Sequence, residues 1–524
     1  MAIPSYIKNT NSVNFSLISL YGVYNLGVRY LHSVLKKKGL SPNLIFFKHL
    51  YLSDSNLPTE LEYEELLSLL RKTNTTFVGI NVGCSSFSQI AVEITLQIKK
   101  KLGIPVVWGG THPTIQPEEC IKIADFLCIG EGEYALFDLI SRFSSGKSIE
   151  DIENVWVRRE GRIIRNGLRP LIHDLDNLPF PDYNNHNKYF IEEDRLYSVD
   201  PFQLYDWQYY IMTSRGCPYS CNFCVGSLYK EIYRGKGKIV RRRSVENTIA
   251  ELMNIKKHFP KVRQIAFVDD VFSIDLDWIA NFVKQYKASV NLPFWCYYHP
   301  LSVKDKVLAL LKDAGVSFVN IGVQSGSERI RKDIFNRKES NESIVEAVKR
   351  VQKYKIMAYL DFIVDNPFDT VEDKQQTLEL LFNLPHPFNL NLISLLFFPG
   401  YNITKMALKE KLISEKDIED NSFKVLSQSA VTFDGKRSRE ELAFICSISL
   451  LARSFIPRSL LHFLTRKKNI TKFPWFQTLI VFTMVSGYIR WLSIGLKFFR
   501  RERFNPIGAK RYWKYLRYIS RVIK

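Results

Sequence analysis

Short apolar runs alternate with amphipathic stretches in two successive parts of the 524-residue chain. In the first part the predicted strands are residues 15–20, 43–47, 77–82, 105–108 and 126–129, and the helical patterns are 26–38, 60–71, 90–101, 118–123 and 133–143. Strands that alternate with helices in this way form an open parallel sheet with helices on both faces. Residues 1–150 are therefore predicted to form a doubly wound α/β domain, which would bind a ligand at the carboxyl ends of its strands.

Residues 151–206 have a different character. Residues 155–165 have the pattern of a hairpin that turns at Glu160 and Gly161, and residues 174–182 are polar and interrupted by prolines. We predict a hairpin and a linker in this segment.

A second series of strands and helices occupies residues 207–410. The predicted strands are 209–213, 264–268, 294–298, 318–323, 358–364 and 389–397, and the helical patterns are 245–258, 276–286, 303–314, 342–354 and 371–382. Six such repeats joined by right-handed crossovers predict a partial (β/α)6 barrel with its chemistry at the carboxyl ends of the strands. Residues 411–524 lack the alternation and are predicted to form a mostly helical, apolar and basic C-terminal region.

Composition limits the class of protein. With 46% hydrophobic and 24% charged residues the chain can form two or three packed cores, and 25 glycines and 21 prolines are ordinary for a globular protein. The N-terminus has no apolar run led by positive charge, and the eight cysteines are either clustered or scattered singly. We therefore expect a reducing, cytoplasmic environment and not a disulfide framework.

The formal net charge of +20 is concentrated at the C-terminal end, where residues 497–524 hold ten basic residues and one acid. The uncharged stretch 473–489 is 17 residues long, shorter than the ~20 that a spanning helix needs. Basic and aromatic residues interleave in the tail, so we predict peripheral membrane contact through a helix on an anionic lipid surface. The alternative is a helical cap on the barrel, and we expect no nucleic-acid partner because no recognisable module is found.

Three cysteines, Cys217, Cys221 and Cys224, follow the first predicted barrel strand with the spacing C-x3-C-x2-C. Three thiolates hold three irons of a [4Fe–4S] cluster and leave the fourth iron open to a small molecule, whereas an electron-transfer cluster normally has four ligands. The alternatives are a zinc site or three unrelated thiols, but zinc prefers four ligands, and no second cysteine pair or nearby histidine completes such a set. We therefore predict a catalytic cluster with these three metal ligands.

This motif after a barrel strand resembles the signature of the radical S-adenosylmethionine (SAM) superfamily, and the resemblance covers roughly residues 209–398. It implies that SAM chelates the open iron through its amino and carboxylate groups. It also implies that one electron from the cluster cleaves SAM to a 5′-deoxyadenosyl radical. The electron would come from a partner such as a flavodoxin or a ferredoxin.

Two acidic residues end the second predicted barrel strand, where this family places acidic groups near the SAM amino group. They are Asp269 and Asp270, and the resemblance makes them candidates for SAM binding. A helix N-cap and a first-turn acid are the alternative interpretation of the same pair.

Residues 321–326 resemble the family's G-x-E-S-G segment, which contacts the SAM ribose and carboxylate. Gln324 replaces the usual Glu and keeps an acceptor without its charge, whereas Ser325 is retained. Lys332 or Lys349 is a candidate for a nearby cation.

The first domain resembles the cobalamin-binding domain that many radical SAM enzymes carry. The resemblance rests on V-W-G-G-T-H-P-T at 107–114 and I-G-E-G-E at 129–133. The residues that it assigns to the cobalamin are Ser85 or Ser86, Gly109, Gly110 and His112. The two glycines lack a Cβ and let the backbone approach a bulky ligand, whereas the histidine is equally well explained as a turn residue.

The best-known cobalamin domains also carry D-x-H-x-x-G, whose histidine ligates cobalt. This chain has G-V-Y-N-L-G at 22–27, so the Asp and the His are both replaced. Many radical SAM relatives share this difference. The resemblance then implies a cobalt without that imidazole and places Tyr24 near the lower face of the cofactor.

These patterns predict an enzyme that uses a [4Fe–4S] cluster, SAM and cobalamin to functionalise an unactivated carbon. The expected outcome is C-methylation, by hydrogen abstraction followed by transfer of a methyl group from cobalamin. A cyclisation or rearrangement is the alternative within this chemistry, and a cobalamin- or cluster-binding sensor without turnover is the alternative outside it. The substrate is predicted to be a small molecule, and the apolar, basic C-terminus favours a lipid-like one.

Overall fold

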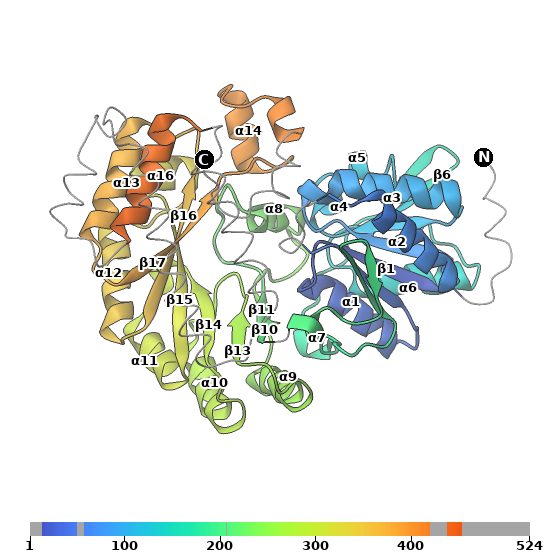
Figure 1. Cartoon of the computed structure of the whole chain (residues 1–524), viewed down its shortest axis with the longest axis horizontal. Coiled ribbons are helices and arrows are strands. Elements are labelled where there is room, and N and C mark those ends of the chain that lie inside the picture. Colours follow the sequence, from blue (N-terminus) through green and yellow to red (C-terminus); the bar gives the residue numbers. More distant parts are fainter. Residues whose placement is uncertain (1–12, 50–56, 206, 420–436, 453–524) are drawn as a thin grey trace. The chain divides into compact units, whose positions relative to one another are not determined.

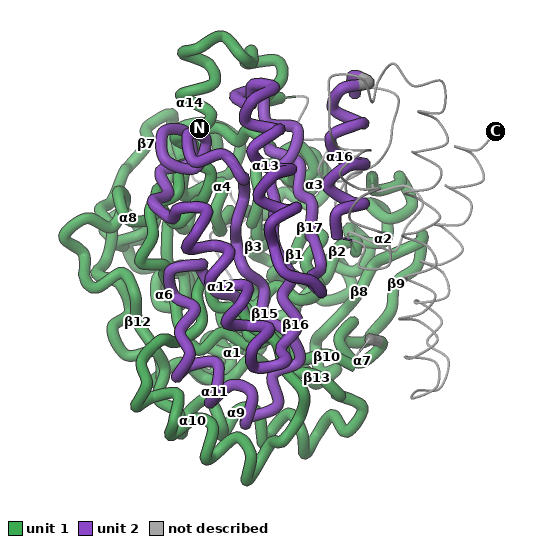
Figure 2. The backbone as a smooth tube through the Cα atoms, turned by 90° about the vertical axis from the view of Figure 1, so that its left-hand side faces the viewer, with its two compact units in different colours: residues 1–296, 396–427 green, residues 297–395, 428–524 purple. Residues whose placement is uncertain are grey.

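The structure is a computed structural model, and it describes residues 13–49, 57–205, 207–419 and 437–452 (Figure 1). The chain divides into two compact units (Figure 2). The first unit comprises Met1–Cys296 and Leu396–Ser427, and the second comprises Tyr297–Leu395 and Gln428–Lys524.

A nine-stranded sheet forms the N-terminal part of the first unit. Its strands are β1 (Phe15–Leu20), β2 (Asn43–Phe47), β3 (Phe77–Asn81), β4 (Val106–Gly109), β5 (Phe126–Cys128), β6 (Val155–Arg159), β7 (Arg162–Arg165), β8 (Lys188–Glu192) and β9 (Arg195–Tyr197). The strand order is β7-β6-β5-β4-β3-β1-β2-β8-β9. Strands β1 to β5 and β8 pair in parallel, whereas the pairs β5–β6, β6–β7 and β8–β9 are antiparallel. The predicted parallel sheet is therefore the centre of a larger, mixed one.

Helices cover both faces of this sheet, as the alternation predicts. They are α1 (Leu26–Lys37), α2 (Glu60–Lys72), α3 (Ser88–Lys101), α4 (Thr111–Ile115), α5 (Pro117–Cys120) and α6 (Glu133–Ser144). Alternate strand residues point to opposite faces, so Ile18 and Ile45 pack with residues of α2, α3 and α5, whereas Leu17 and Leu44 pack with residues of α1 and α6. Burying each such side chain stabilises the fold by about 1.5–3 kcal/mol.

The segment predicted as a hairpin and linker supplies four strands to this sheet. The hairpin of β6 and β7 turns at Glu160 and Gly161, whose φ values of 52° and 77° are those of a tight hairpin turn. Strand β8 then pairs with β2, although it begins and ends with the charged residues Lys188 and Glu192. Both of these are buried, and their charges have partners on other parts of the chain, which the sequence pattern of the strand does not reveal.

A six-stranded sheet has the strand order of a (β/α) barrel. Its strands are β10 (Gln208–Ile211), β13 (Gln264–Phe267), β14 (Phe294–Tyr298), β15 (Val316–Gln324), β16 (Met357–Val364) and β17 (Phe388–Ser394). They follow one another in sequence order, with β10 and β17 at the two ends. The helices between them are α9 (Val245–His258) and α10 (Leu276–Ser289) in the first unit, and α11 (Asp305–Asp313), α12 (Asn341–Lys353) and α13 (Val371–Asn383) in the second.

Short elements complete the described chain. They are α7 (Phe202–Tyr205), the two-stranded pair β11 (Ser214–Arg215) and β12 (Arg241–Arg242), α8 (Val225–Ile232), α14 (Asn402–Lys409) and α16 (Arg439–Leu451). The predicted fold class, with two α/β parts followed by helices, is confirmed.

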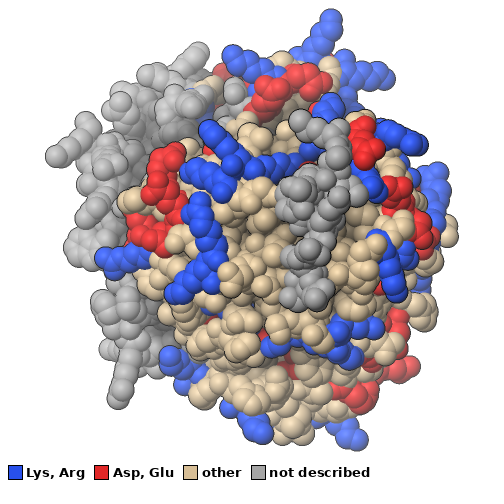
Figure 3. All heavy atoms as spheres, turned by 90° about the vertical axis from the view of Figure 1, so that its right-hand side faces the viewer, with Lys and Arg blue, Asp and Glu red and all other residues tan. Residues whose placement is uncertain are grey.

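The predicted membrane-surface region, residues 473–524, lies outside the described residues. Among the described helices, none has the length and apolar character that crossing a bilayer requires. On the face drawn in Figure 3, the described Lys and Arg side chains are interspersed with Asp and Glu.

Candidate cofactor site

The three cysteines lie in the loop between β11 and α8, shortly after β10. Gly216 turns the chain into this loop with a φ of 87°, and a Cβ there would lie 2.3 Å from the Ile239 carbonyl oxygen. Cys224 is the N-cap of α8, and its Sγ accepts a hydrogen bond from Gly226 N at 3.4 Å. The last thiol of the motif is thus fixed at a helix N-terminus, which favours the thiolate form.

Lys230, two turns along α8 from Cys224, holds the first half of the loop. Its Nζ donates to the carbonyl oxygens of Pro218 at 2.7 Å and Tyr219 at 2.6 Å, and to Ser220 Oγ at 3.0 Å. These three residues are the spacer between Cys217 and Cys221. The Lys230 ammonium group therefore holds the spacer through hydrogen bonds to all three of its residues.

The cysteine thiols must lose their protons before they can bind a metal. Burial raises the pKa of Cys217 to about 11 and also raises that of Cys224, and a nearby cation offsets such a shift. Among the described residues, no three His, Cys, Asp or Glu side chains converge on a position for a single ion. In a cubane cluster each thiolate binds a different iron, so this arrangement fits a [4Fe–4S] cluster better than a zinc site.

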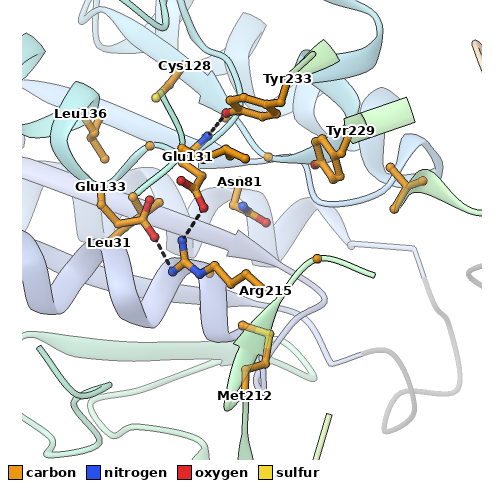
Figure 4. A pocket seen from close by; sticks show the side chains of 18 of the residues that line it. Leu31, Asn81, Cys128, Glu131, Glu133, Leu136, Met212, Arg215, Tyr229 and Tyr233 are labelled. Atoms are coloured by element: carbon orange, nitrogen blue, oxygen red, sulfur yellow. Dashed lines mark hydrogen bonds and ion pairs between the residues drawn. The ribbon is translucent and has the colours of Figure 1, made fainter. Parts of the chain in front are cut away.

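The loop borders a cavity of about 350 Å³ within the first unit (Figure 4). One wall includes residues of β1, β3, β4 and β5, of α1 and α6, and of the loop after β5. The other includes the cysteine loop, α8, Arg241 and Asp270. Eight lining residues are glycines, namely Gly27, Gly79, Gly109, Gly110, Gly130, Gly132, Gly216 and Gly226. Cys217 also lines the cavity, so one space touches both the predicted cobalamin residues and the predicted cluster loop.

At two of these glycines a Cβ would make only ordinary van der Waals contacts. At Gly109 the nearest atom to an added Cβ is the Cys128 carbonyl oxygen at 3.5 Å, and at Gly226 it is Cys224 Sγ at 3.6 Å, so packing alone requires neither glycine. Gly110 differs, because its φ of 105° and the 3.0 Å approach of Val82 require glycine for the backbone itself. Glycines at both positions keep the backbone of β4 and of α8 uncovered by side chains where they line the cavity, which lets a ligand approach the backbone closely.

Two arginines of the cysteine-loop region bind the I-G-E-G-E segment. Arg215 Nη1 donates to Glu131 Oε1 at 3.0 Å and its Nη2 donates to Glu133 Oε1 at 2.6 Å. Arg241, on the strand paired with that of Arg215, donates to both Glu131 oxygens at 2.8 and 3.0 Å. Sequence reasoning assigned the segment to cobalamin and missed these ion pairs.

Two tyrosines, one on α8 and one at its C-cap, contact the two glycine-rich segments. Tyr233 accepts a hydrogen bond from Glu131 N at 2.8 Å, and Tyr229 donates to Thr111 Oγ1 at 3.1 Å. Both tyrosines line the cavity. The G-G-T-H-P-T and G-E-G-E segments are therefore both joined to the helix that begins at Cys224.

The two aspartates at the end of β13 have different surroundings. Asp269 is buried, and its Oδ1 accepts hydrogen bonds from Thr213 N at 3.0 Å, Thr213 Oγ1 at 2.9 Å and the Ser214 hydroxyl. Asp270 is exposed to the cavity, and burial of its carboxylate followed by repulsion from Asp269 raises its pKa. Asp269 thus ties β13 to the start of the cysteine loop, and Asp270 is the member of the pair that faces the ligand space.

Four residues assigned to cobalamin by resemblance are not among those that line the cavity: Tyr24, Ser85, Ser86 and His112. The ring of Tyr24 packs against those of Tyr210 and His49, with centroids 4.8 and 6.3 Å away. Ser85 Oγ and His112 Nδ1 are hydrogen-bonded at 3.0 Å, and both side chains are buried. Burial lowers the pKa of His112 to about 4, so its imidazole is neutral near pH 7.

The remaining SAM candidates belong to β15 and the loop after it in the second unit. Gln324 has a φ of 72°, an unusual conformation for a residue with a side chain, next to a bulge in the pairing of β15 with β16. Ser325 is buried and its Oγ accepts from Ser327 N at 3.2 Å. Lys332 is exposed on the turn that follows.

Two buried arginines that the sequence did not single out contact this segment. Arg331 Nη1 donates to the carbonyl oxygen of Ser325. Arg337 is buried and its Nη2 donates to the carbonyl oxygen of Gly322 at 2.6 Å. Lys349, by contrast, lines a groove between α12 and α13. Arg337 Nε also donates to Glu339 Oε1, so its charge is already compensated by a buried carboxylate.

Two family models match the chain. The model described as radical SAM superfamily matches residues 211–381, and the model described as B12 binding domain matches residues 19–140. The chain is a radical SAM protein with an N-terminal B12-binding domain. The predicted family is confirmed, and with it the cofactor set that these domains imply, namely a [4Fe–4S] cluster and SAM for the barrel and cobalamin for the first sheet.

Several curated proteins resemble this radical SAM protein. An uncharacterized methyltransferase of Pyrococcus horikoshii is 26% identical over 395 residues, which cover 74% of this chain and 79% of the relative. The cytidylyl-2-hydroxyethylphosphonate methyltransferase of Streptomyces wedmorensis is 23% identical over 66% of this chain and 69% of its own length. An anaerobic magnesium-protoporphyrin IX monomethyl ester cyclase of Rubrivivax gelatinosus is 24% identical over 59% of this chain and 55% of its own length.

Solved structures share the fold of the radical SAM protein. The cobalamin-dependent SAM radical enzyme OxsB, with aqua-cobalamin bound, has a TM-score of 0.65 at 15% identity, and the match covers 98% of this chain and 80% of OxsB. The radical SAM methyltransferase TsrM of Kitasatospora setae, with cobalamin and a [4Fe–4S] cluster bound, has a TM-score of 0.58 at 16% identity, and the match covers 76% of this chain and 78% of TsrM. These likenesses establish the architecture of a cobalamin-dependent radical SAM enzyme.

Proposed function

We propose that this protein is a cobalamin-dependent radical SAM methyltransferase that methylates an unactivated carbon of a small molecule. When bound, the cluster and SAM supply a hydrogen-abstracting radical, and cobalamin supplies a carrier for the methyl group. Two relatives named as methyltransferases, at 26% and 23% identity, support this outcome among the reactions that the family performs.

The cavity is the observation that carries the proposal. Gly109 at the end of β4 and Cys217 of the cysteine loop line the same space of about 350 Å³. Methylation by radical chemistry needs the methyl carrier and the radical source on the two sides of one substrate carbon. A cavity with a B12-type wall and a cluster-loop wall supports that requirement, because a substrate between them is within reach of both.

The residues of the chain have separate tasks in this proposal. Cys217, Cys221 and Cys224 hold the cluster, and Lys230 keeps their loop closed. Asp270, which faces the cavity, accepts a hydrogen bond from the SAM ammonium group. Apolar side chains of the cavity, among them Leu31, Leu136, Met212 and Val225, keep water away from the reacting carbon.

The stoichiometry of the proposed reaction provides a test. Replacing C–H by C–CH3 consumes two SAM cations and two electrons, since one SAM is reduced to methionine and 5′-deoxyadenosine and the other leaves S-adenosylhomocysteine. The electrons come from a low-potential donor such as a reduced flavodoxin or ferredoxin. The holoenzyme, supplied with such a donor and a fractionated anaerobic extract as the substrate source, should form the two nucleoside products in equal amounts.

A cyclisation is the second candidate, because a relative named as a cyclase is 24% identical over 328 residues. A cyclase would form 5′-deoxyadenosine without S-adenosylhomocysteine. A sensor without turnover would form neither product, so the ratio of the two nucleosides separates all three functions.

A further inference from the structure

The ion pairs between the cysteine-loop region and the I-G-E-G-E segment join the loop assigned to the cluster to the cavity wall assigned to cobalamin. Arg215 lies two residues before the cluster ligand Cys217, and its guanidinium points toward Glu131 and Glu133 (Figure 4). Glu131 and Glu133 in turn belong to the cavity wall that follows β5. A displacement of the cysteine loop therefore moves a side chain that holds the cobalamin-side wall.

These groups are largely removed from solvent. The side chains of Arg215 and Glu131 are 17% and 16% exposed, and those of Glu133 and Arg241 are 6% exposed. A buried ion pair is weak as a source of net stability, because desolvation of the charges offsets their attraction. Its directional hydrogen bonds instead hold the I-G-E-G-E segment in one conformation. This segment forms part of the cavity wall, so the hydrogen bonds position that wall.

A glycine and a tyrosine fix the same wall from the other side. Gly130 has a φ of 73°, and an added Cβ would lie 1.8 Å from the Tyr233 hydroxyl oxygen, so a glycine is required where the tyrosine contacts the backbone. The same hydroxyl accepts from Glu131 N at 2.8 Å. Tyr233 is the C-cap of α8, the helix that begins after Cys224, so the residue before the cysteine loop and the helix after it both contact one short segment, residues 130–133.

We propose that Arg215 is a positioning residue that couples assembly of the cluster to binding of cobalamin. A cluster fixes Cys217 and so fixes Arg215, which orders Glu131 and Glu133 in the cavity wall. A cobalamin that binds to a wall already in place loses less conformational freedom and binds more tightly. The inference rests on the cofactor assignment and is independent of whether the product is methylated or cyclised.

Because of thermodynamic linkage, the proposed coupling can be measured in two ways. If the cluster tightens cobalamin binding by some factor, cobalamin stabilises cluster binding by the same factor, and such couplings are typically about 5–150-fold. The first measurement is the Kd of the full-length chain for hydroxocobalamin, measured anaerobically with and without a reconstituted cluster. The second is the rate at which a chelator removes iron with and without hydroxocobalamin.

The variant Arg215→Met removes both ion pairs and keeps the length of the side chain. In the wild-type chain we expect hydroxocobalamin to bind at least about fivefold more tightly when the cluster is present. In Arg215→Met we expect this ratio to fall to about one, while both forms still bind hydroxocobalamin. The matched control is Arg165→Met, which removes an exposed two-point pair with Glu118 at 2.8 Å on strand β7 and should leave the ratio unchanged.

Two variants on the other side of these contacts keep the proposal testable if Arg215→Met folds poorly. Glu133→Gln removes the charge that pairs with Arg215, and Tyr233→Phe removes the acceptor of Glu131 N, so each should lower the ratio of the two Kd values. Combining Glu133→Gln with Arg215→Met should add nothing further, because both act through one ion pair. Equal Kd values with and without the cluster in the wild type, or an unchanged ratio in Arg215→Met, would overturn the coupling, whereas failure of both wild-type forms to bind hydroxocobalamin would overturn the cofactor assignment as well.

Discussion

Lys230 Nζ donates a hydrogen bond to the carbonyl oxygen of Tyr219 at 2.6 Å, across the spacer between the first two cluster cysteines. Because the same ammonium also binds Pro218 and Ser220, one side chain sets the width of the loop. Removing the charge in Lys230→Met should leave the fold intact and loosen the loop. We expect a chelator to remove iron about tenfold faster from this variant, since hydrogen bonds to a charged group contribute about 1.5–3 kcal/mol each.

The control for this prediction is Lys238→Met, which changes an exposed lysine a few residues beyond α8. Its rate of iron loss should equal that of the wild type. Equal rates for Lys230→Met and the wild type would show that the cluster holds the loop without help from Lys230.

The three cluster cysteines should be individually indispensable. Cys217→Ala, Cys221→Ala and Cys224→Ala each remove one iron ligand, so iron content after anaerobic reconstitution should fall from about four per chain to below one. Formation of 5′-deoxyadenosine from SAM should fall below detection in all three. Cys120→Ala, which changes a buried cysteine of the first sheet's core, should keep both properties, and SAM cleavage by any of the three variants would contradict the ligand assignment.

A fully buried ion pair predicts a large effect on stability. Arg29 donates to Asp200 through two nitrogens at 2.7 and 2.8 Å, and both side chains are 0% exposed. Asp200→Ala leaves a buried guanidinium without its counter-ion, so the free energy of unfolding should fall by about 3–5 kcal/mol. Urea denaturation measures this change.

The exposed pair of Arg142 and Asp151, at 2.6 Å, provides the comparison. Asp151 is 70% exposed, so Asp151→Ala should cost at most about 1 kcal/mol. If Asp200→Ala and Asp151→Ala lowered the free energy of unfolding by similar amounts, the buried Arg29 would not depend on Asp200 as its counter-ion.

Asp361 predicts how stability depends on pH. Burial raises its pKa to about 6 from 3.8, partly opposed by the hydrogen bond that Asn391 donates at 2.8 Å. Because the folded chain holds this proton more tightly than the unfolded chain, the group's contribution to stability is present at low pH and is lost as pH rises through about 6. Asp361→Asn keeps an acceptor for Asn391 without a charge, so it should raise the free energy of unfolding at pH 7 by roughly 2 kcal/mol.

The gain from Asp361→Asn should shrink as the pH approaches 4, which a series of urea denaturations between pH 4 and 7 measures. Asp277→Asn changes an exposed carboxylate of α10 and should have little effect at any pH in this range. A gain that is independent of pH would show that the Asp361 carboxyl has an ordinary pKa.

Local patterns predicted most of the strands and helices, because each is a short apolar run or an amphipathic stretch with clear ends. Strands β1, β2 and β14 and helix α9 begin and end at the predicted residues. Strand β8 was missed because Lys188 and Glu192 interrupt its apolar character. Their compensating partners, among them Asp182 for Lys188 and Lys48 for Glu192, are remote in sequence.

The same reason explains what sequence reasoning found and missed at the site. The spacing of Cys217, Cys221 and Cys224 is local, so it predicts a cluster without knowledge of the fold. The role of Arg215 depends on its ion pair with Glu133, which lies 82 positions earlier in the chain and contacts it only in the folded protein. A charged residue next to a metal motif, paired with acids in a glycine-rich segment, is the one signal that could have suggested this contact.

The composition of the reconstituted protein tests the central claim most directly. The full-length chain, reconstituted with iron, sulfide and hydroxocobalamin without oxygen, should retain about four irons, four sulfides and one cobalamin after desalting. The electron paramagnetic resonance signal of its reduced cluster should change when SAM is added, as expected for a cluster with one open iron. Bound zinc in place of iron, a cluster signal that is indifferent to SAM, or a chain that retains no cobalamin would contradict the account.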